Sequence, residues 1–201
     1  MTHERRWVFV THPNVAIDPA VPVTRWPLSE RGRARMQRAL RQPWVRDVRA
    51  VHCSTEQKAI DGAALLAEHL GLGFTTHEAL GENDRSSTGY LAPPDFERAA
   101  DAFFAEPERS EQGWARAVDA QRRIVDAVQA IDRSDGTLGT IAIVSHGAVG
   151  TLLQCWLAQR PISRAWDQPG QGGGHWFGFT LRPAALLSPW RAIDDDDGEP
   201  A

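Results

Sequence analysis

Two hydrophobic runs of this chain each end in a small hydroxyl residue, a histidine and a turn residue. The first is residues 7–13, Trp-Val-Phe-Val-Thr-His-Pro, and the second is residues 141–147, Ile-Ala-Ile-Val-Ser-His-Gly. Runs of this kind are typical of buried parallel strands, which deliver side chains to the sheet edge where open α/β folds bind ligands. We therefore expect His12 and His146 to lie side by side at one sheet edge, where imidazole can act as a nucleophile or an acid.

Strand-like and helical segments alternate along the chain. β-Strands are expected near residues 7–10, 50–54, 74–76, 140–145 and 176–181. One helix is expected to begin after Ser29, placed as its N-cap, and others to cover residues 56–70, 94–105, 111–131 and 149–157. The alternation predicts an α/β fold, a three-layer sandwich with a mainly parallel central sheet and helices on both faces.

Length and charge limit the classes of protein to consider. The 201 residues fit a single domain, 1–201, with a flexible acidic tail expected over about residues 192–201. The net charge of −4 gives no support to nucleic-acid binding, so a nucleic-acid partner is not expected. A membrane partner is not expected either, because no stretch approaches the roughly 18 apolar residues that a span needs.

The cysteines and tryptophans suggest where the protein works and what it contacts. Cys53 and Cys155 both lie in apolar surroundings and are interpreted as packed thiols, which favours a reducing compartment. Residues 1–12 contain no apolar segment of the kind that signal peptides carry. We therefore expect a cytoplasmic protein. Eight tryptophans would allow a homodimer if some of them are exposed.

A third junction between a strand and a helix adds a cation. Residues 52–59 read His-Cys-Ser-Thr-Glu-Gln-Lys-Ala, so Lys58 falls in the first helical turn. A lysine there is unfavourable with the helix dipole unless it faces an anion or an acid, although a solvated surface lysine is the alternative. His146 stands directly before another helix, whose free N–H groups attract phosphate or carboxylate.

Taken in order, four segments resemble the histidine phosphatase superfamily, the phosphoglycerate-mutase-like fold. Residues 10–13, Val-Thr-His-Pro, occupy the place of that family's Arg-His-Gly signature. Residues 27–32, Pro-Leu-Ser-Glu-Arg-Gly, are similar to its Pro-Leu-Thr-x-x-Gly segment, and residues 53–59 to its Ser-Ser-Pro-x-x-Arg-Ala segment. Ser-His-Gly at residues 145–147 matches its second histidine motif. The resemblance covers about residues 7–181.

The resemblance implies a mechanism and a substrate class. A neutral histidine, His12 here, attacks phosphorus and becomes a phosphohistidine that water later hydrolyses. The second histidine, His146, helps to hold the phosphoryl oxygens, and a carboxylic acid protonates the leaving oxygen. The expected ligand is a small phosphorylated molecule, with neither a metal nor another cofactor required.

Three positions depart from the family pattern. Thr11 stands where the family has its first arginine, Pro13 where it has glycine, and Lys58 where it has its second arginine. Pro13 keeps a carbonyl that could orient the imidazole. Thr11 and Lys58 would remain in the substrate-binding set, but a lysine lacks the planar two-point grip of a guanidinium on phosphate. The site must therefore recruit an arginine from elsewhere or have changed its role.

The polar segment 80–89 lies where the family places its proton-donating glutamate. Either Glu82 or Asp84 could be that acid, Arg85 could replace a missing arginine, and Ser86 could donate a hydroxyl. A polar capped turn with a solvated Asp-Arg pair is the alternative interpretation.

Two residues outside that segment complete the candidate set. Arg25, in the loop after His12, is a weaker substitute for a family arginine. His175 follows a glycine-rich stretch that could border the cleft or act as a hinge. The arginines of residues 31–41 are interpreted as a solvated face paired with acids.

Three functional hypotheses remain open on the sequence. The leading one is a metal-independent phosphatase that hydrolyses a small phosphomonoester through a phosphohistidine, a mutase being related chemistry. The second is a catalytically degenerate member that binds an anionic ligand or a protein partner without turnover, which Thr11 and Lys58 motivate. The third is transfer or hydrolysis of a non-phosphate substrate by the same two histidines.

Overall fold

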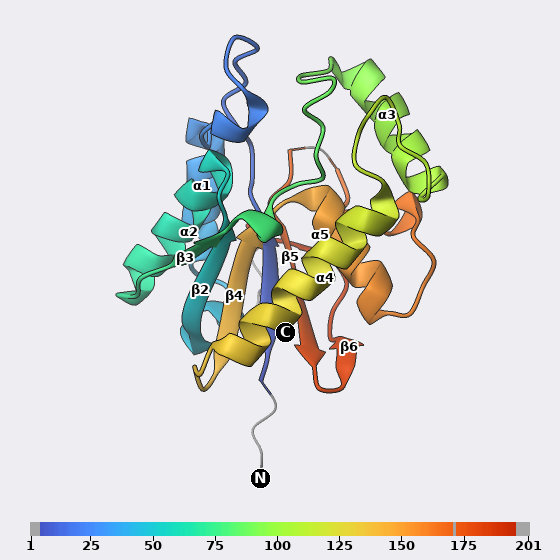
Figure 1. Ribbon diagram of the computed structural model, residues 1–201. Helices are drawn as coiled ribbons and strands as arrows, with labels where there is room; N and C mark the ends of the chain where they lie inside the picture. Colours follow the sequence, from blue (N-terminus) through green and yellow to red (C-terminus); the bar gives the residue numbers. More distant parts are fainter. Residues whose placement is uncertain (1–4, 171, 196–201) are drawn as a thin grey trace.

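A seven-stranded sheet forms the centre of the computed structural model, which describes residues 5–170 and 172–195 (Figure 1). The strands are β1 (Trp7–Thr11), β2 (Val48–Ser54), β3 (Thr75–His77), β4 (Thr140–Ser145), β5 (His175–Leu181), β6 (Ala184–Leu186) and β7 (Arg191–Ala192). The helices are α1 (Glu30–Ala39), α2 (Gln57–Leu70), α3 (Pro93–Ala105), α4 (Ala117–Ser134) and α5 (Gly147–Leu157). Short 3₁₀ turns, η1 to η4, cover Val23–Arg25, Pro43–Asp47, Glu78–Leu80 and Arg164–Trp166.

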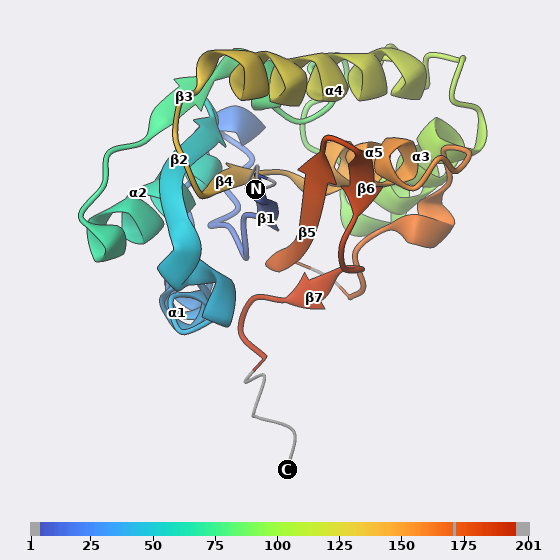
Figure 2. The same cartoon turned by 90° about the horizontal axis from the view of Figure 1, so that it is seen from below.

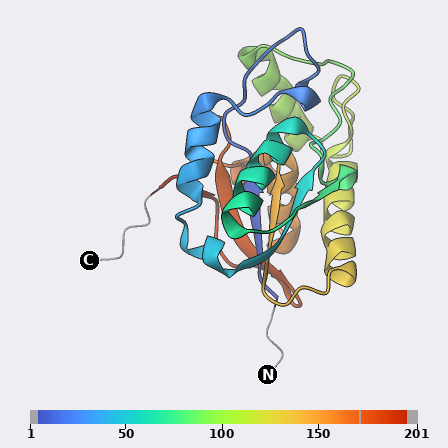
Figure 3. The same cartoon turned by 90° about the vertical axis from the view of Figure 1, so that its left-hand side faces the viewer.

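The sheet follows the order β3-β2-β4-β1-β5-β6, and β7 also pairs with β5. Strands β3, β2, β4 and β1 are parallel, whereas β5 runs antiparallel to β1. Helices α4 and α5 cover one face and α1 and α2 the other (Figures 2 and 3). The predicted α/β sandwich with a mainly parallel sheet is confirmed.

Strand β1 illustrates why the parallel strands read as continuous apolar runs. Val8 and Val10 pack into the cluster beneath α1 and α2, whereas Trp7 and Phe9 pack into the cluster beneath α4 and α5. Successive side chains of a strand point to opposite faces, so both sets must be apolar when helices cover both faces.

Capping residues fix the start of α1 and the end of α2. The Ser29 hydroxyl accepts a hydrogen bond from the Gly32 N–H, as an N-cap does, and Gly71 ends α2 in the left-handed conformation with φ of 65°. The long helix α4 begins at Ala117 rather than near residue 111, because Gln112 and Gly113 have φ of 47° and 82°. Left-handed backbone at two successive residues cannot continue an α-helix.

The acidic tail was predicted to begin about ten residues from the end, and that boundary is wrong. Ala192 belongs to β7, Ile193 is fully buried, and Asp194 pairs with Arg35 and Arg38 of α1. The arginine-rich helix therefore has one buried member, Arg35, that ties the end of the described chain to the sheet. Residues 196–201 lie outside the described residues.

Among the described residues, no helix is both long and apolar enough to span a membrane. Cys53 and Cys155 are buried free thiols, as predicted.

Candidate active site

Two histidines meet at the carboxyl edge of the sheet because their strands are neighbours in register. Thr11 of β1 pairs with Ser145 of β4, and the His12 N–H donates to the Ser145 carbonyl at 3.0 Å. The next residues, His12 and His146, therefore leave the sheet together, with ring centroids 5.1 Å apart and the rings nearly perpendicular at 71°. This juxtaposition is the one that the sequence predicted.

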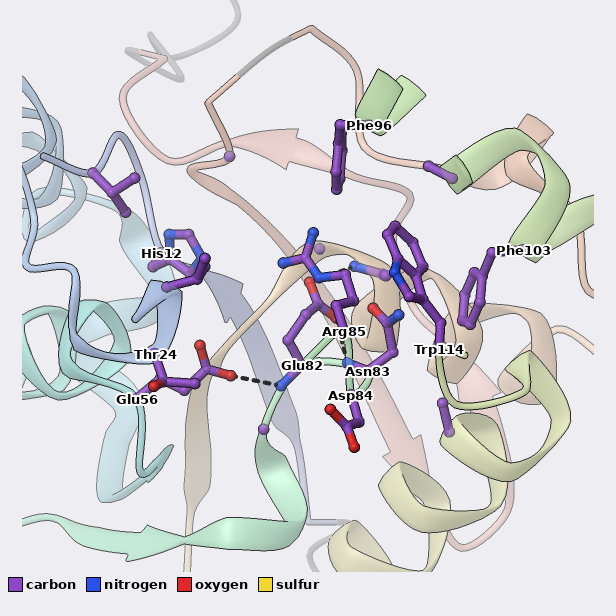
Figure 4. Close-up of a pocket in the computed structure, with 18 of the residues that line it drawn as sticks. His12, Thr24, Glu56, Glu82, Asn83, Asp84, Arg85, Phe96, Phe103 and Trp114 are labelled. Carbon is purple, nitrogen blue, oxygen red and sulfur yellow. Dashed lines mark hydrogen bonds between the residues drawn. The ribbon is translucent and has the colours of Figure 1, made fainter. Parts of the chain in front are cut away.

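His12 is oriented by a backbone carbonyl. Its Nδ1 lies 3.0 Å from the Pro13 carbonyl oxygen, which can only accept, so Nδ1 carries the proton in the neutral ring. Nε2 then holds the lone pair, and His12 lines a large cavity (Figure 4). Burial, followed by the nearby Lys58 charge, lowers the pKa of His12 from its ordinary 6.5 to about 4. The imidazole is therefore unprotonated and nucleophilic at neutral pH.

Two glycines allow the chain to pack closely around the His12 loop. A Cβ on Gly32 of α1 would stand 2.0 Å from the Asn14 carbonyl oxygen, and one on Gly173 would stand 2.2 Å from the His12 carbonyl oxygen. The His12 carbonyl also accepts from the Gly174 N–H at 3.1 Å. The glycine-rich stretch before β5 thus packs against the His12 loop.

A buried arginine joins this glycine stretch to α1. Arg35 donates to the Gly173 and Gly174 carbonyls at 3.0 and 3.2 Å, to the Asn14 side chain at 3.1 Å, and to Asp194. Because three separate segments share one guanidinium, their relative positions are fixed next to His12.

His146 is fully buried behind His12. Its Nε2 lies 2.8 Å from Ser54 Oγ and 3.3 Å from Glu56 Oε1. A carboxylate oxygen only accepts, so Nε2 carries the proton of the neutral ring. Burial holds the pKa of His146 well below its ordinary value, and the ring therefore acts as a neutral donor.

Glu56 is a buried carboxylate in the middle of this arrangement. Its Oε2 accepts from Lys58 Nζ at 2.5 Å, and its Oε1 accepts from the Glu82 N–H at 3.0 Å. Burial alone would raise the pKa of Glu56, but His146 and Lys58 outweigh it and bring the pKa down to about 2. Lys58 also donates to the Val23 carbonyl at 2.8 Å. Lys58 and Glu56 are both less than a tenth exposed.

The two candidate acids, Glu82 and Asp84, lie in different environments. The Glu82 carboxyl accepts from the Ala148 and Val149 N–H groups at the start of α5, at 3.3 and 3.2 Å. Burial is the main cause that raises its pKa. Asp84 is exposed, and hydrogen bonds from Ser86 lower its pKa. Glu82 is therefore the carboxyl more able to hold a proton near neutral pH.

Arg85 points from its turn toward His12 in the close-up (Figure 4). Its guanidinium lies 5.1 Å from the centre of the Phe96 ring and 5.6 Å from that of Trp114, within the range of cation–π attraction. These residues belong to the wall of a cavity of about 1400 Å³ between the loop after β1 and the segment around α3. Its wall also includes Glu56, Glu82, Asp84 and Ser86.

Four predicted binding residues are not among the described residues that line this cavity: Thr11, Arg25, Lys58 and His175. The buried Thr11 hydroxyl donates to Gln168 Oε1 at 2.7 Å and accepts from the His175 N–H at 2.9 Å. Arg25 is exposed at the end of η1. His175 is buried with its ring 6.4 Å from that of Trp190. Lys58 lies behind Glu56 rather than on the cavity wall.

Sequence reasoning missed two residues with central positions. Glu56 precedes α2 with extended backbone, φ −78° and ψ 139°, so its side chain can turn toward Lys58 although residues two apart do not face each other within a helix. Arg123 of α4 donates hydrogen bonds of 2.9 Å to the carbonyls of Ala79, Gly81 and Glu82. No sequence pattern marks either residue, because both roles depend on the packing of distant segments.

The geometry combines a lone pair, a proton donor and a cation around one cavity. His12 can supply the lone pair, Glu82 the proton and Arg85 the charge, and the start of α5 lies beside them. Within the described residues, no group of three or more His, Cys, Asp or Glu side chains is arranged to hold a metal ion.

Comparisons with known proteins agree with this architecture. The model of the histidine phosphatase superfamily (branch 1) matches residues 20–175, a range that begins after His12 and includes His146. No curated protein gives a significant sequence match.

Solved structures share the fold at low sequence identity. A mycobacterial glucosyl-3-phosphoglycerate phosphatase with inorganic phosphate has a TM-score of 0.77 and 20% identity, over 96% of this chain and 100% of that one. The complex of that phosphatase with VO3 has a TM-score of 0.76 and 22% identity, over 94% and 99%. Bacillus stearothermophilus YhfR has a TM-score of 0.74 and 21% identity, over 95% and 97%.

Proposed function

Because the chain belongs to the histidine phosphatase superfamily, we propose that it hydrolyses a small phosphomonoester through a phosphohistidine on His12, without a metal ion. The observation that carries the proposal is the state of His12. Its Nδ1–H is fixed by the Pro13 carbonyl, and its low pKa leaves Nε2 with a free lone pair in the cavity. A nucleophile must be both deprotonated and oriented, and this histidine meets both conditions.

The two halves of the reaction use the same residues. Nε2 of His12 attacks phosphorus, the bond from phosphorus to the ester oxygen breaks, and protonated Glu82 gives its proton to the leaving oxygen. Water then attacks the phosphohistidine, the phosphorus–nitrogen bond breaks, and the Glu82 carboxylate takes the water proton. The raised pKa of Glu82 supports its role as the acid, and the lowered pKa of Asp84 argues against that residue.

The cavity supports a substrate with a sizeable organic part. Arg85 would meet the phosphoryl group, while Phe96 and Trp114 offer apolar surface to the alcohol. A cavity of about 1400 Å³ exceeds the volume that a small phosphorylated sugar fills, since typical ligand pockets are about 300–1,000 Å³.

A second candidate is a member of the family that binds an anionic ligand or a protein partner without turnover. Two observations favour it: Lys58 is already paired with Glu56, and the Thr11 hydroxyl is committed to Gln168. Neither residue then replaces a phosphate-binding arginine. Enzymes accelerate phosphomonoester hydrolysis by up to about 10²¹-fold, so weak stabilisation of the transferring group would leave little activity.

We also propose a cytoplasmic location and a homodimeric assembly. The two buried free thiols support a cytoplasmic location, where cysteines stay reduced. Trp166 is 40% exposed and would be available to a homodimer interface. Sedimentation of the purified protein at several concentrations tests the dimer.

The test of the proposed activity is hydrolysis of an aryl phosphate in EDTA, from about pH 4 to about pH 9, by the wild type and His12→Ala. Turnover in the wild type should fall at least about 10³-fold in the variant, because the covalent route is lost. His69→Ala, an exposed histidine of α2, is the matched control and should keep wild-type activity.

Mass spectrometry after an alkaline quench should find one added phosphoryl group on the peptide that contains His12. Equal traces of turnover in the wild type and His12→Ala would contradict the proposal. Binding of the aryl phosphate without turnover would then favour the second candidate.

A further inference from the structure

The carboxylate of Glu56 lies among groups of the kind that bind anions in proteins. Two groups donate hydrogen bonds to it, Lys58 Nζ at 2.5 Å and the Glu82 N–H at 3.0 Å, and His146 Nε2 lies 3.3 Å from its Oε1. A cation, a backbone N–H and an imidazole N–H are the groups that hold phosphoryl oxygens in proteins. Here one side chain of the protein lies against all three, and it accepts hydrogen bonds from the first two.

Glu56 also separates two of these donors from the cavity. Glu56 is on the cavity wall, whereas neither Lys58 nor His146 is among the described lining residues. Lys58 is 3% exposed and His146 is not exposed at all. An incoming phosphoryl group would therefore meet a carboxylate first, with the donors behind it.

We propose that Glu56 is an internal anion that occupies part of the phosphoryl-binding site and determines which substrates the site accepts. This inference rests on the proposed phosphoryl site beside His12. Glu56 cancels the charge of Lys58, so a ligand is held through Arg85 and through its organic part. The site then selects against compact, highly charged phosphates such as inorganic phosphate. It accepts esters whose alcohol fills the aromatic part of the cavity.

The charges around Glu56 agree with this reading. Lys58 and His146 face it from α2 and from the start of α5, and Glu82 faces it from the turn after η3. The charges of Arg85 and Arg123 act on the same group of residues. With His12 and His146 neutral, Arg85 and Arg123 are the cations of this group on the cavity wall, and neither has a carboxylate hydrogen bond among the described residues. Arg123 is held by three backbone carbonyls, so Arg85 is the cation placed to meet a ligand.

The test is the affinity for inorganic phosphate and vanadate, measured near neutral pH by calorimetry and by the rise in melting temperature with anion concentration. Glu56→Gln keeps an oxygen that can accept from Lys58 but removes the negative charge. We expect it to bind phosphate about tenfold or more tightly than the wild type, because the charge of a carboxylate on the cavity wall no longer repels the ligand. Glu78→Gln, which removes an exposed carboxylate of the same cavity wall, should change the affinity less than about twofold.

A second variant covers the case in which Glu56→Gln folds poorly. Glu56→Ala leaves Lys58 without its acid, and formate or phosphate should restore its melting temperature by taking the vacated position. Failure of every anion to stabilise either variant beyond the wild type would overturn the inference.

The two proposals can fail separately. If wild-type turnover depends on His12 but neither Glu56 variant gains phosphate affinity, the Glu56 inference is wrong and the phosphatase proposal stands. If the wild type has no turnover but Glu56→Gln binds phosphate tightly, the inference stands and the phosphatase proposal is wrong. No gain in anion binding together with no turnover would contradict both.

Discussion

The pH dependence of the reaction should begin far below the usual range of a histidine. Turnover requires neutral His12, whose pKa is lowered from 6.5 to about 4. At pH 5 a group with a pKa of about 4 is about 90% neutral, whereas one with the ordinary value is about 3% neutral, a difference of about 30-fold. We therefore expect kcat/KM for an aryl phosphate to stay high down to pH 5 and to fall about tenfold per pH unit only below about pH 4.

The titration of the substrate must be separated from that of the enzyme, because a phosphomonoester loses its second proton near pH 6. Imidazole signals in NMR spectra, assigned by comparison with His12→Ala, report the pKa of His12 without substrate. At the alkaline side, activity should fall as Glu82 loses its proton, above its raised pKa. Glu82→Gln should abolish that descending limb and leave the His12 inflection in place. An inflection of His12 near pH 6.5 would refute the argument that burial activates it.

The lowered pKa of His12 also predicts how the free energy of unfolding depends on pH. Because the pKa of His12 is lower in the folded chain than in the unfolded chain, protonation favours unfolding. The stability that neutral His12 contributes to the fold is fully present above pH 6.5 and is lost as the pH falls from 6.5 to about 4. Between pH 7 and pH 5 the loss is at most about 2 kcal/mol, and less where solvent in the open cavity screens the charge. Urea unfolding should therefore show a smaller loss of stability between pH 7 and pH 5 for His12→Ala than for the wild type, the remaining loss coming from other buried histidines such as His146.

Three substitutions test other parts of the structure. Gly150→Ala should destabilise the fold by about 1–2 kcal/mol in urea unfolding, because the added Cβ would lie 2.7 Å from the Phe9 ring and 2.8 Å from the Trp190 ring. Gly73→Ala is its control: a Cβ there meets no atom within 4 Å, so the substitution should be neutral or slightly stabilising. Arg35→Met should cost about 3 kcal/mol in the same assay, because it leaves buried carbonyls without their donor and leaves Asp194 paired only with the exposed Arg38. Arg85→Met should raise KM for an aryl phosphate about tenfold with little change in melting temperature, since its guanidinium lies at the cavity wall rather than in an ion pair.

Local patterns were sufficient to predict the sheet edge that carries the histidines. A strand that ends in Thr-His-Pro or Ser-His-Gly positions its histidine by chain geometry alone, and the register of Thr11 with Ser145 then brings the two rings together. The caps at Ser29 and Gly71 were predictable for the same reason, because each depends on residues within one turn.

Features that depend on how side chains from distant segments pack, rather than on where a strand ends, could not be predicted. Glu56 looked like an ordinary residue at a helix start, and only the approach of Glu82 and His146 from other elements places it at the centre of the site. Trp114 was expected within α4 but lies before it, where it packs against Phe103 of α3. Strands β6 and β7 are too short to show a two-residue period.

The site separates the orientation of the nucleophile from the binding of the anion. His12 is positioned by backbone groups, namely the Pro13 and Ser145 carbonyls and the Gly174 N–H, and by glycines that admit close packing. These contacts are made by main-chain groups, so they do not depend on which side chains bind the anion. Anion binding depends instead on side chains, and here Thr11 and Lys58 are both engaged within the protein. A chain can therefore retain an activated histidine while it exchanges the charges that select the substrate, which is the combination that His12 and Glu56 present together.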